Sequence, residues 1–289
     1  MTDIIQSTTP NFTVERKSKC IVVSQPLEVG EVQHYLVRAD AHHDSPYANV
    51  KLEKELLDEA LERKALIFDV GDCFDAMQGT NDRRSSNKGK IKALQDRDDY
   101  WNALVENAAE FYRPYAKNWV MFSQGNHESS ILKHNEVDIT KMLVEKLRAE
   151  DGSQVLAGGY GGYVKLRFTV GGTSRFAKTI KYFHGTGGAA PVTLGMIQTQ
   201  RQQADHGLVD VFWGGHNHNY FNCIRPERVL LPSCKEVVKQ VRHMNIPSTK
   251  ETGGAFDIQM NMLKAVGAYW LRVKAYPRCV KMSVEEVYS

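Results

Sequence analysis

The sequence predicts an α/β fold: a sandwich of two halves, with a cluster of polar motifs at one edge of its sheets. Two observations favour it. Up to about residue 150, short apolar runs alternate with segments of helical periodicity, as in strand–helix–strand units. Beyond that point the apolar runs are separated by glycine-rich turns, which is typical of further strands.

The first half alternates between strand-like runs and helical spacing. Leu52, Leu56 and Ala60 recur every four residues, so they would share one face of a helix. The short apolar runs between such segments are typical of buried strands in a largely parallel sheet. In chain order we expect a strand at 32–38, a helix at 52–63, a strand at 65–70, a helix at 98–112, a strand at 119–122 and a helix at 139–147.

The second half changes character. Residues 164–170, 179–183 and 208–213 alternate or run apolar, and they predict three more strands. The glycine-rich stretch 158–162 is not followed by the Gly-Lys-Ser/Thr of a phosphate-binding loop. We therefore interpret it as a tight turn between strands.

The chain is expected to form one domain over residues 1–289, because it contains no internal repeat and no long linker. The polar residues 1–18 predict a loosely ordered arm. The last third, residues 232–289, carries no motif that we can assign. We expect it to form a cap on the substrate side or to complete the second sheet.

Composition excludes several classes of protein. The apolar fraction of 42% supports a sizeable core, and 37 basic residues nearly balance 34 acidic ones. Five scattered cysteines without a C-x-x-C pair are typical of a reducing interior and exclude a cysteine zinc knuckle. No apolar run approaches the roughly 18 residues of a membrane span. We expect a cytoplasmic protein with no membrane partner.

Five polar motifs follow strand-like runs in a fixed order. Single motifs such as Gly-Asp are often only turns, whereas adjacent Asn and His after a strand have no packing purpose. Carboxylate, amide and imidazole groups together are the ligands of a two-metal hydrolytic site. The motifs are Asp40-Ala41-His42, Gly71-Asp72, Gly125-Asn126-His127-Glu128, His184-Gly185 and Gly215-His216-Asn217-His218.

These motifs resemble the D-x-H, G-D, G-N-H-[DE], H and G-H-x-H signatures of the calcineurin-like metallophosphoesterases. They span about two thirds of the chain. With the alternation above, the resemblance implies a four-layer α/β/β/α sandwich of two mixed sheets flanked by helices, with the metal site at one edge. A narrower likeness to members from bacteriophage and prophage genomes is carried by the phrases Ala76-Met77-Gln78-Gly79, 158–162, Pro191-Val192-Thr193 and Tyr269-Trp270-Leu271.

The resemblance also implies a role for each motif residue. His127 would be the catalytic residue that protonates the leaving group or stabilises the phosphoryl oxygens, while a metal-bridging hydroxide attacks phosphorus. Manganese is the expected ion, with magnesium, iron, zinc or nickel as alternatives. Seven side chains would bind two divalent ions: Asp40, His42 and His218 hold one, Asn126, His184 and His216 hold the other, and Asp72 bridges them.

Other polar residues near the motifs have ordinary interpretations. Cys73 and Asp75 follow the bridging carboxylate, and we give neither a specific role. The residues interpreted as supporting or loop residues are His43, Asp44 and Glu128, and those interpreted as ordinary histidines are His34, His134, His206 and His243.

The leading hypothesis is a dinuclear phosphodiesterase acting on DNA, RNA or nucleotides, in the host cytoplasm if a phage encodes it. A phosphomonoesterase, including a protein phosphatase, would use the same ligands. A scaffold that binds metal without catalysis is the alternative from another class. The basic loop 83–92 could close over a phosphate backbone, although an ordinary solvated loop is favoured. The sequence does not indicate an oligomeric state.

Overall fold

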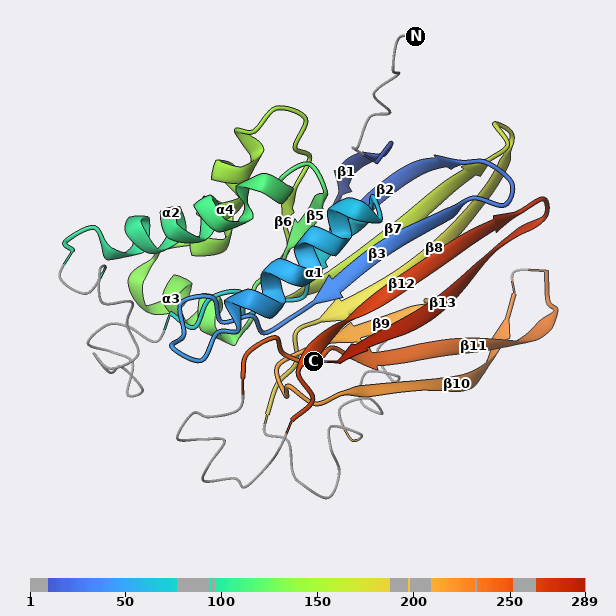
Figure 1. Cartoon of the computed structure of the whole chain (residues 1–289). Coiled ribbons are helices and arrows are strands. Elements are labelled where there is room, and N and C mark those ends of the chain that lie inside the picture. Colours follow the sequence, from blue (N-terminus) through green and yellow to red (C-terminus); the bar gives the residue numbers. More distant parts are fainter. Residues whose placement is uncertain are drawn as a thin grey trace, which may run out of the picture.

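The computed structural model describes residues 10–76, 94, 97–187, 197, 209–231, 233–251 and 264–288. These residues form two mixed sheets that pack face to face, with helices against the outer face of one sheet (Figure 1). The predicted α/β fold with two mixed sheets flanked by helices is confirmed. No helix among the described residues is long and apolar enough to cross a membrane.

The six-stranded sheet, which we call sheet B, has the order β13-β12-β3-β4-β5-β6. Its central strands β3, β4, β5 and β6 run parallel, and β12 and β13 are added antiparallel to one side. The strands are β3 (Val32–Arg38), β4 (Leu66–Asp69), β5 (Trp119–Phe122), β6 (Leu156–Ala157), β12 (Gly267–Tyr276) and β13 (Cys279–Tyr288).

The seven-stranded sheet, sheet A, has the order β1-β2-β7-β8-β9-β11-β10. Strands β8, β9 and β11 are parallel neighbours, whereas β10 is antiparallel to β11. The strands are β1 (Thr13–Lys17), β2 (Cys20–Leu27), β7 (Gly161–Val170), β8 (Ser174–Phe183), β9 (Val211–Gly214), β10 (Phe221–Leu230) and β11 (Glu236–Asn245).

Two helices, α1 and α4, begin at polar side-chain caps. The Asn49 side chain accepts a hydrogen bond from the Leu52 N–H, and that of Asp138 accepts one from Lys141, both at 2.9 Å. These bonds satisfy free N–H groups in the first turns of α1 and α4. The helices are α1 (Val50–Glu62), α2 (Tyr100–Tyr112), the short 3-10 helix η3 (Arg113–Tyr115), α3 (Asn126–Asn135) and α4 (Ile139–Arg148).

Two apolar cores result from the two-residue period of the strands. Leu36 and Ile67 face the helices, and their chain neighbours Val37 and Phe68 face sheet A. The buried apolar residues of all four α-helices belong to the first core. Within the described ranges, the four α-helices therefore pack against sheet B.

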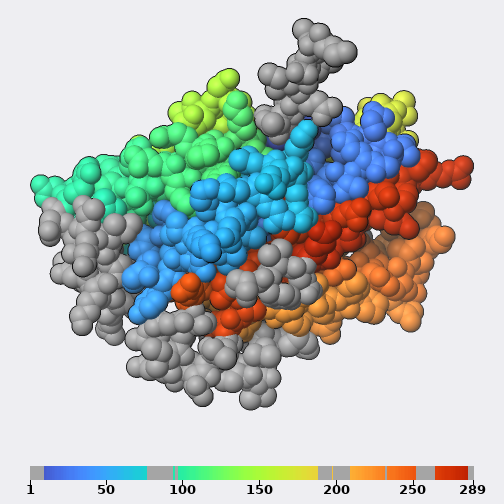
Figure 2. Space-filling view, in the orientation of Figure 1, coloured from blue at the N-terminus to red at the C-terminus, as the bar shows by residue number. Residues whose placement is uncertain are grey.

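Both ends of the chain contribute strands to the sheets. Residues 1–18 were predicted to be a loosely ordered arm, yet Thr13–Lys17 is an edge strand paired with β2. Residues 236–288 supply β11 to sheet A and β12 and β13 to sheet B. The surface of β12 and β13 (red) borders that of α1 (cyan) in Figure 2. Arg63, at the end of α1, lies over the Trp270 ring of β12 at 4.6 Å. The basic loop 83–92 lies outside the described residues.

Candidate metal centre

The five polar motifs follow strands whose carboxyl ends meet at one edge of the two sheets. Parallel strands β3, β4 and β5 of sheet B lead into the first three motifs. Parallel strands β8 and β9 of sheet A lead into the last two. Because parallel strands present their carboxyl ends at the same edge, this topology brings together side chains that lie far apart in the sequence.

One group of ligand atoms is formed by Asp40, His42 and His218. The His218 Nε2 lies 3.3 Å from Asp40 Oδ1 and 3.3 Å from His42 Nε2. Two imidazole nitrogens and a carboxylate oxygen thus converge on one point. Asp40 and His42 are buried, and the His218 side chain is 18% exposed. Solvent therefore reaches this group from the side of His218.

A second group contains Asp72, Asn126, His184 and His216. The His184 Nε2 lies 3.1 Å from Asp72 Oδ2 and 3.2 Å from Asn126 Oδ1. The His216 Nδ1 lies 2.6 Å from the same Asn126 oxygen. The groups are adjacent, because His184 Nε2 is also 3.9 Å from Asp40 Oδ1. The structure therefore brings together all seven side chains that the sequence singled out.

The donor set of the second group fits a cation. His184 directs Nδ1 at the Val70 carbonyl oxygen at 2.9 Å, and His216 directs Nε2 at the Gly187 carbonyl oxygen at 2.9 Å. In the neutral rings these nitrogens carry the protons, so the lone pairs of the other two nitrogens face the Asp72 and Asn126 oxygens. Lone pairs that converge in this way repel one another unless a proton or a metal ion lies between them.

The spacing of the ligand atoms also fits. Two atoms that each lie about 2.1 Å from one divalent ion are about 3.0–3.4 Å apart in octahedral or tetrahedral coordination. Four contacts within the two groups, at 3.1–3.3 Å, have this length, whereas the 2.6 Å between His216 Nδ1 and Asn126 Oδ1 is shorter. Asp40, His42 and His218 could hold one ion and Asp72, Asn126, His184 and His216 the other.

The backbone at the site is unusual. Asp40, His42, Asp72, His216 and His218 all have positive φ angles, between 45° and 71°. Side chains other than glycine enter this left-handed region rarely and at a cost, and such residues concentrate at functional sites. Half of the non-glycine residues with positive φ that the structure describes are predicted metal ligands.

Gly71 and Gly125 allow two motif loops to approach each other closely. A Cβ atom at Gly125 would lie 2.0 Å from Asp72 Oδ1, and one at Gly71 would lie 2.7 Å from His184 Nδ1. Gly71 also has φ +105°, which disfavours other residues. The glycines that precede the ligand residues are therefore required for packing as well as for chain direction.

Glu128 connects the loops that carry Asp72 and Gly125 through backbone hydrogen bonds. It is 1% exposed, and its carboxylate accepts hydrogen bonds from the N–H groups of Gly125 at 2.8 Å, Phe74 at 2.9 Å and Asp72 at 3.2 Å. Burial and the nearby Asp72 carboxylate raise the pKa of Glu128 well above its ordinary value. The interpretation of Glu128 as a supporting residue agrees with these contacts.

His127 stands beside the two groups. Its backbone N–H donates to Asp72 Oδ1 at 3.0 Å, and the ring Nδ1 contacts the carbonyl oxygen of Asp75. The Nε2 atom is 3.8 Å from Asp72 Oδ2, so this side of the ring faces the Asp72 carboxylate. The Nε2 atom, and not Nδ1, is therefore on the side of the ligand groups.

Asp75 has more contacts than the sequence suggested. We gave it no specific role, but its Oδ1 lies 3.0 Å from His42 Nδ1 and 4.0 Å from His127 Nδ1. Burial opposes its charge, yet the contact with His42 and the charge of Lys250 lower the pKa of Asp75. Burial lowers the pKa of His42 to about 4, which favours the neutral ring that binds metal. Asp75 therefore orients a predicted ligand.

Electrostatics couple His184 to the carboxylates. Burial disfavours its charge, but the Asp72 and Asp40 carboxylates outweigh this and raise the pKa of His184 to about 10. The neighbouring His127 and His184 lower the pKa of Asp72 well below its ordinary value, against the effect of burial. In the metal-free protein the positive charge in this group is therefore a proton on His184.

The remaining polar residues agree with their ordinary interpretations where the structure describes them. Cys73 is buried, and its Sγ lies near Arg38 at 3.5 Å, outside both ligand groups. Asp44 accepts hydrogen bonds from the N–H groups of Asp75 and Ala76 at 2.6 and 2.9 Å, so it shapes the same loop. His243 stacks on Phe212 at 4.7 Å. His34 is half-buried in β3, His134 lies in the last turn of α3, and His206 lies outside the described residues.

Comparisons with known proteins give distant likenesses. No protein-family model matches the sequence, and no curated protein matches it. Among solved structures, a metallophosphoesterase from Sphaerobacter thermophilus is 12% identical, with 89% of each chain covered and a TM-score of 0.37. GAP50, the anchor in the inner membrane complex of Plasmodium, is 12% identical, with 89% of this chain and 84% of that chain covered and a TM-score of 0.43.

Vacuolar Protein Sorting 29 from Cryptosporidium parvum is 11% identical, with 89% of this chain and 99% of that chain covered and a TM-score of 0.35. Similarity at this level does not assign an activity. The function is therefore argued below from the geometry of the site.

Proposed function

We propose that this protein is a metal-dependent phosphoester hydrolase of the calcineurin-like kind, with two divalent ions at the edge of its sheets. One observation carries the proposal. Carboxylate, amide and imidazole side chains from five strand ends converge in two adjacent groups whose ligand atoms have metal-like spacing. Such a donor set without thiolate suits manganese, which we propose as the ion, and also magnesium, iron, zinc or nickel.

The residues of the chain have separable tasks in this proposal. When bound, two divalent cations supply the positive charge that activates water and neutralises the phosphoryl oxygens. Asp40 and Asp72 balance that charge, and Asp75 holds His42 in one orientation. His127 delivers a proton from Nε2 to the leaving oxygen, while its Nδ1 is fixed by the Asp75 carbonyl oxygen.

We further propose a phosphodiester substrate, a nucleic acid or a nucleotide, and a cytoplasmic site of action. The short phrases shared with phage and prophage members support nucleic-acid metabolism, in which case the cytoplasm is that of the host. The half-buried ring of Tyr160, 5.6 Å from the His184 ring, offers an aromatic face next to the site on which a base can stack. A phosphomonoesterase would use the same ligands and is the second candidate.

The experiment is hydrolysis of bis(p-nitrophenyl) phosphate and p-nitrophenyl phosphate by metal-stripped protein, with manganese, magnesium, nickel or zinc added back. We expect manganese to restore cleavage of the diester. Asp72→Asn is expected to abolish it, because Asp72 lies next to the second ligand group and beside His127. His127→Ala is expected to keep both metals and lose about 10²- to 10⁴-fold in turnover, the usual contribution of a general acid.

The other results of these experiments would each favour a different function or a different role for His127. Cleavage of the monoester alone would replace the diesterase by a phosphomonoesterase. A protein that binds two metals and cleaves neither substrate would favour a scaffold that has kept the site without catalysis. Loss of metal in His127→Ala would show that this residue supports the metal site rather than the proton transfer.

A further inference from the structure

A segment outside the motifs runs across the site. Residues 246–251 continue β11, and the Ile246 N–H donates to the Gly214 carbonyl oxygen at 2.8 Å, at the end of β9. Ser248 then forms a bridge to Ala39 beside the first motif, and Lys250 forms a bridge to Ala48. This segment belongs to the last third of the chain, which the sequence analysis left without a function.

Consecutive residues fix this segment to the scaffold of the site. The Ser248 hydroxyl donates to the Asp40 carbonyl oxygen at 2.5 Å, and the Thr249 hydroxyl donates to Glu53 Oε2 at 2.9 Å. Glu53 is itself buried and paired with Arg38 at 2.5 Å. The backbone of the segment is therefore held at a defined distance from the first ligand group, and the Lys250 side chain starts from a fixed point.

Lys250 directs its ammonium group toward the loop that follows Asp72. Its Nζ lies 3.8 Å from Asp75 Oδ1, and only 15% of its side chain is exposed. Asp75 lies between His42 and His127, so the charge of Lys250 is on the side of the site where His127 stands. His42, Asp75 and His127 are close enough together to hold a metal ion, but Lys250 already supplies a cation there.

This cation is incompletely satisfied by the described part of the chain. A distance of 3.8 Å is a charge contact and is too long for a hydrogen bond. Asp75 is also shared with His42, and an ammonium group carries three N–H donors. The Nζ atom is not fully buried, so its N–H donors remain available to water or to a ligand. An anionic ligand over the site would supply the missing acceptors.

We propose that Lys250 is an anion-binding residue of the site, whose ammonium group donates to a nonbridging phosphate oxygen of the bound substrate. The inference rests on the proposed function for the identity of the substrate as a phosphoester. Ser248 and Thr249 act as positioning residues for this contact.

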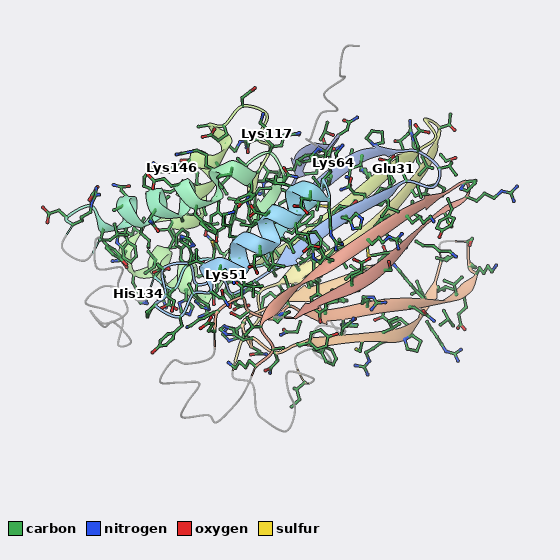
Figure 3. All side chains as sticks on the ribbon, viewed as in Figure 1. Glu31, Lys51, Lys64, Lys117, His134 and Lys146 are labelled. Atoms are coloured by element: carbon green, nitrogen blue, oxygen red, sulfur yellow. The ribbon has the colours of Figure 1, made fainter. Side chains whose placement is uncertain are left out.

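The test is calorimetric titration of the manganese-loaded protein with inorganic phosphate, together with elemental analysis of each variant. Lys250→Met keeps the length of the side chain and removes its charge. We expect it to weaken phosphate binding about tenfold or more, the effect of one charge-assisted hydrogen bond, with unchanged metal content. Lys250→Arg should retain most of the affinity. Lys51→Met, on the exposed face of α1, is the matched control and should bind as the wild type does (Figure 3).

The alternative to phosphate binding is that Lys250 acts only through its pairing with Asp75. If Lys250 only neutralised Asp75, Lys250→Met would have no effect in an Asp75→Asn background, and this result would overturn the proposal. Wild-type phosphate affinity in Lys250→Met, loss of metal from that variant, or no phosphate binding by the wild type would also overturn it. Phosphate binding that depends on Lys250 in a protein without hydrolytic activity would support it and contradict the proposed function.

Discussion

Individual ligand residues carry both the strain and the charge of this site. Asp40, Asp72 and His216 lie in the left-handed region of φ, where their backbones turn off the strands and place oxygen and nitrogen atoms close together. Because these atoms lie close together, His184 Nε2 pairs with Asp72 Oδ2 at 3.1 Å. In the metal-free protein a proton therefore occupies a position that a metal ion would take.

This pairing predicts a pH dependence of metal binding. The pKa of His184 is raised from 6.5 to about 10, so the stability that the ion pair gives to the metal-free protein is present below pH 6.5 and is lost as pH rises through about 10. Metal binding requires the neutral ring, so at pH 8 the incoming ion must displace this proton. His42, with a pKa of about 4, has none to release at that pH.

The measurement is calorimetric manganese binding at pH 8 in buffers that differ in their enthalpy of ionisation. We expect the wild type to release about one proton more than His184→Asn, which keeps an oxygen ligand but has no titrating ring. His134→Gln, in the last turn of α3, is the matched control (Figure 3). Equal proton release by the wild type and His184→Asn would contradict the assignment.

At the scale of elements, the strand ends were predictable and the start of α3 was not. The sequence analysis places the motif around Asn126 after a strand and expects no helix there, whereas Asn126 and His127 form the first turn of α3. The signal was present: Glu128 three residues after Gly125 is the pattern of a capping box, and its carboxylate accepts from the Gly125 N–H. The same residues form the metal-site motif and the start of the helix, and the sequence analysis used them only for the motif.

Glu128 joins α3 to the loop after β4, and this predicts the effect of a conservative change. Both carboxylate oxygens accept backbone hydrogen bonds, one from Phe74 and the other from Gly125 and Asp72. A glutamine would place its NH2 group against one of these donors. We expect Glu128→Gln to lower the free energy of unfolding by about 2 kcal/mol or more and to weaken metal binding.

Denaturant unfolding of the metal-free protein checks this expectation. Glu145→Gln is the matched control, since Glu145 is exposed on α4 and pairs only with Lys141 in the described structure, at 3.7 Å. A Glu128→Gln variant as stable as the control would mean that the loops are held without this carboxylate.

The role of Asp75 could not be deduced from its position in the sequence. Its carboxylate meets His42, which precedes it by more than thirty residues, and Lys250, which follows it by far more. Such contacts depend on how the loops cross above the sheet edge, and no local pattern encodes them. The strand-end rule predicts which motifs converge but does not predict which neighbours orient them.

For the whole molecule, the main feature that the sequence did not predict is the division of the C-terminal strands between two sheets. β12 pairs antiparallel with β3, with Trp270 opposite Leu36, although these residues are separated by most of the chain. β11 pairs with β9 in the other sheet. Apolar alternation identifies a strand but not its partner, so residues 232–289 had no predictable place. The segment between β11 and β12 contains Lys250 and places it beside the site.

The central claim, two metal ions held between two sheets, is tested most directly by counting them. The measurement is elemental analysis of protein that has been stripped, equilibrated with manganese and freed of excess ion. We expect two ions per chain in the wild type and fewer than two in Asp72→Asn, which weakens the second ligand group. A wild-type protein that binds one ion or none would contradict the account, because the seven ligand residues would then lack the function that their convergence indicates.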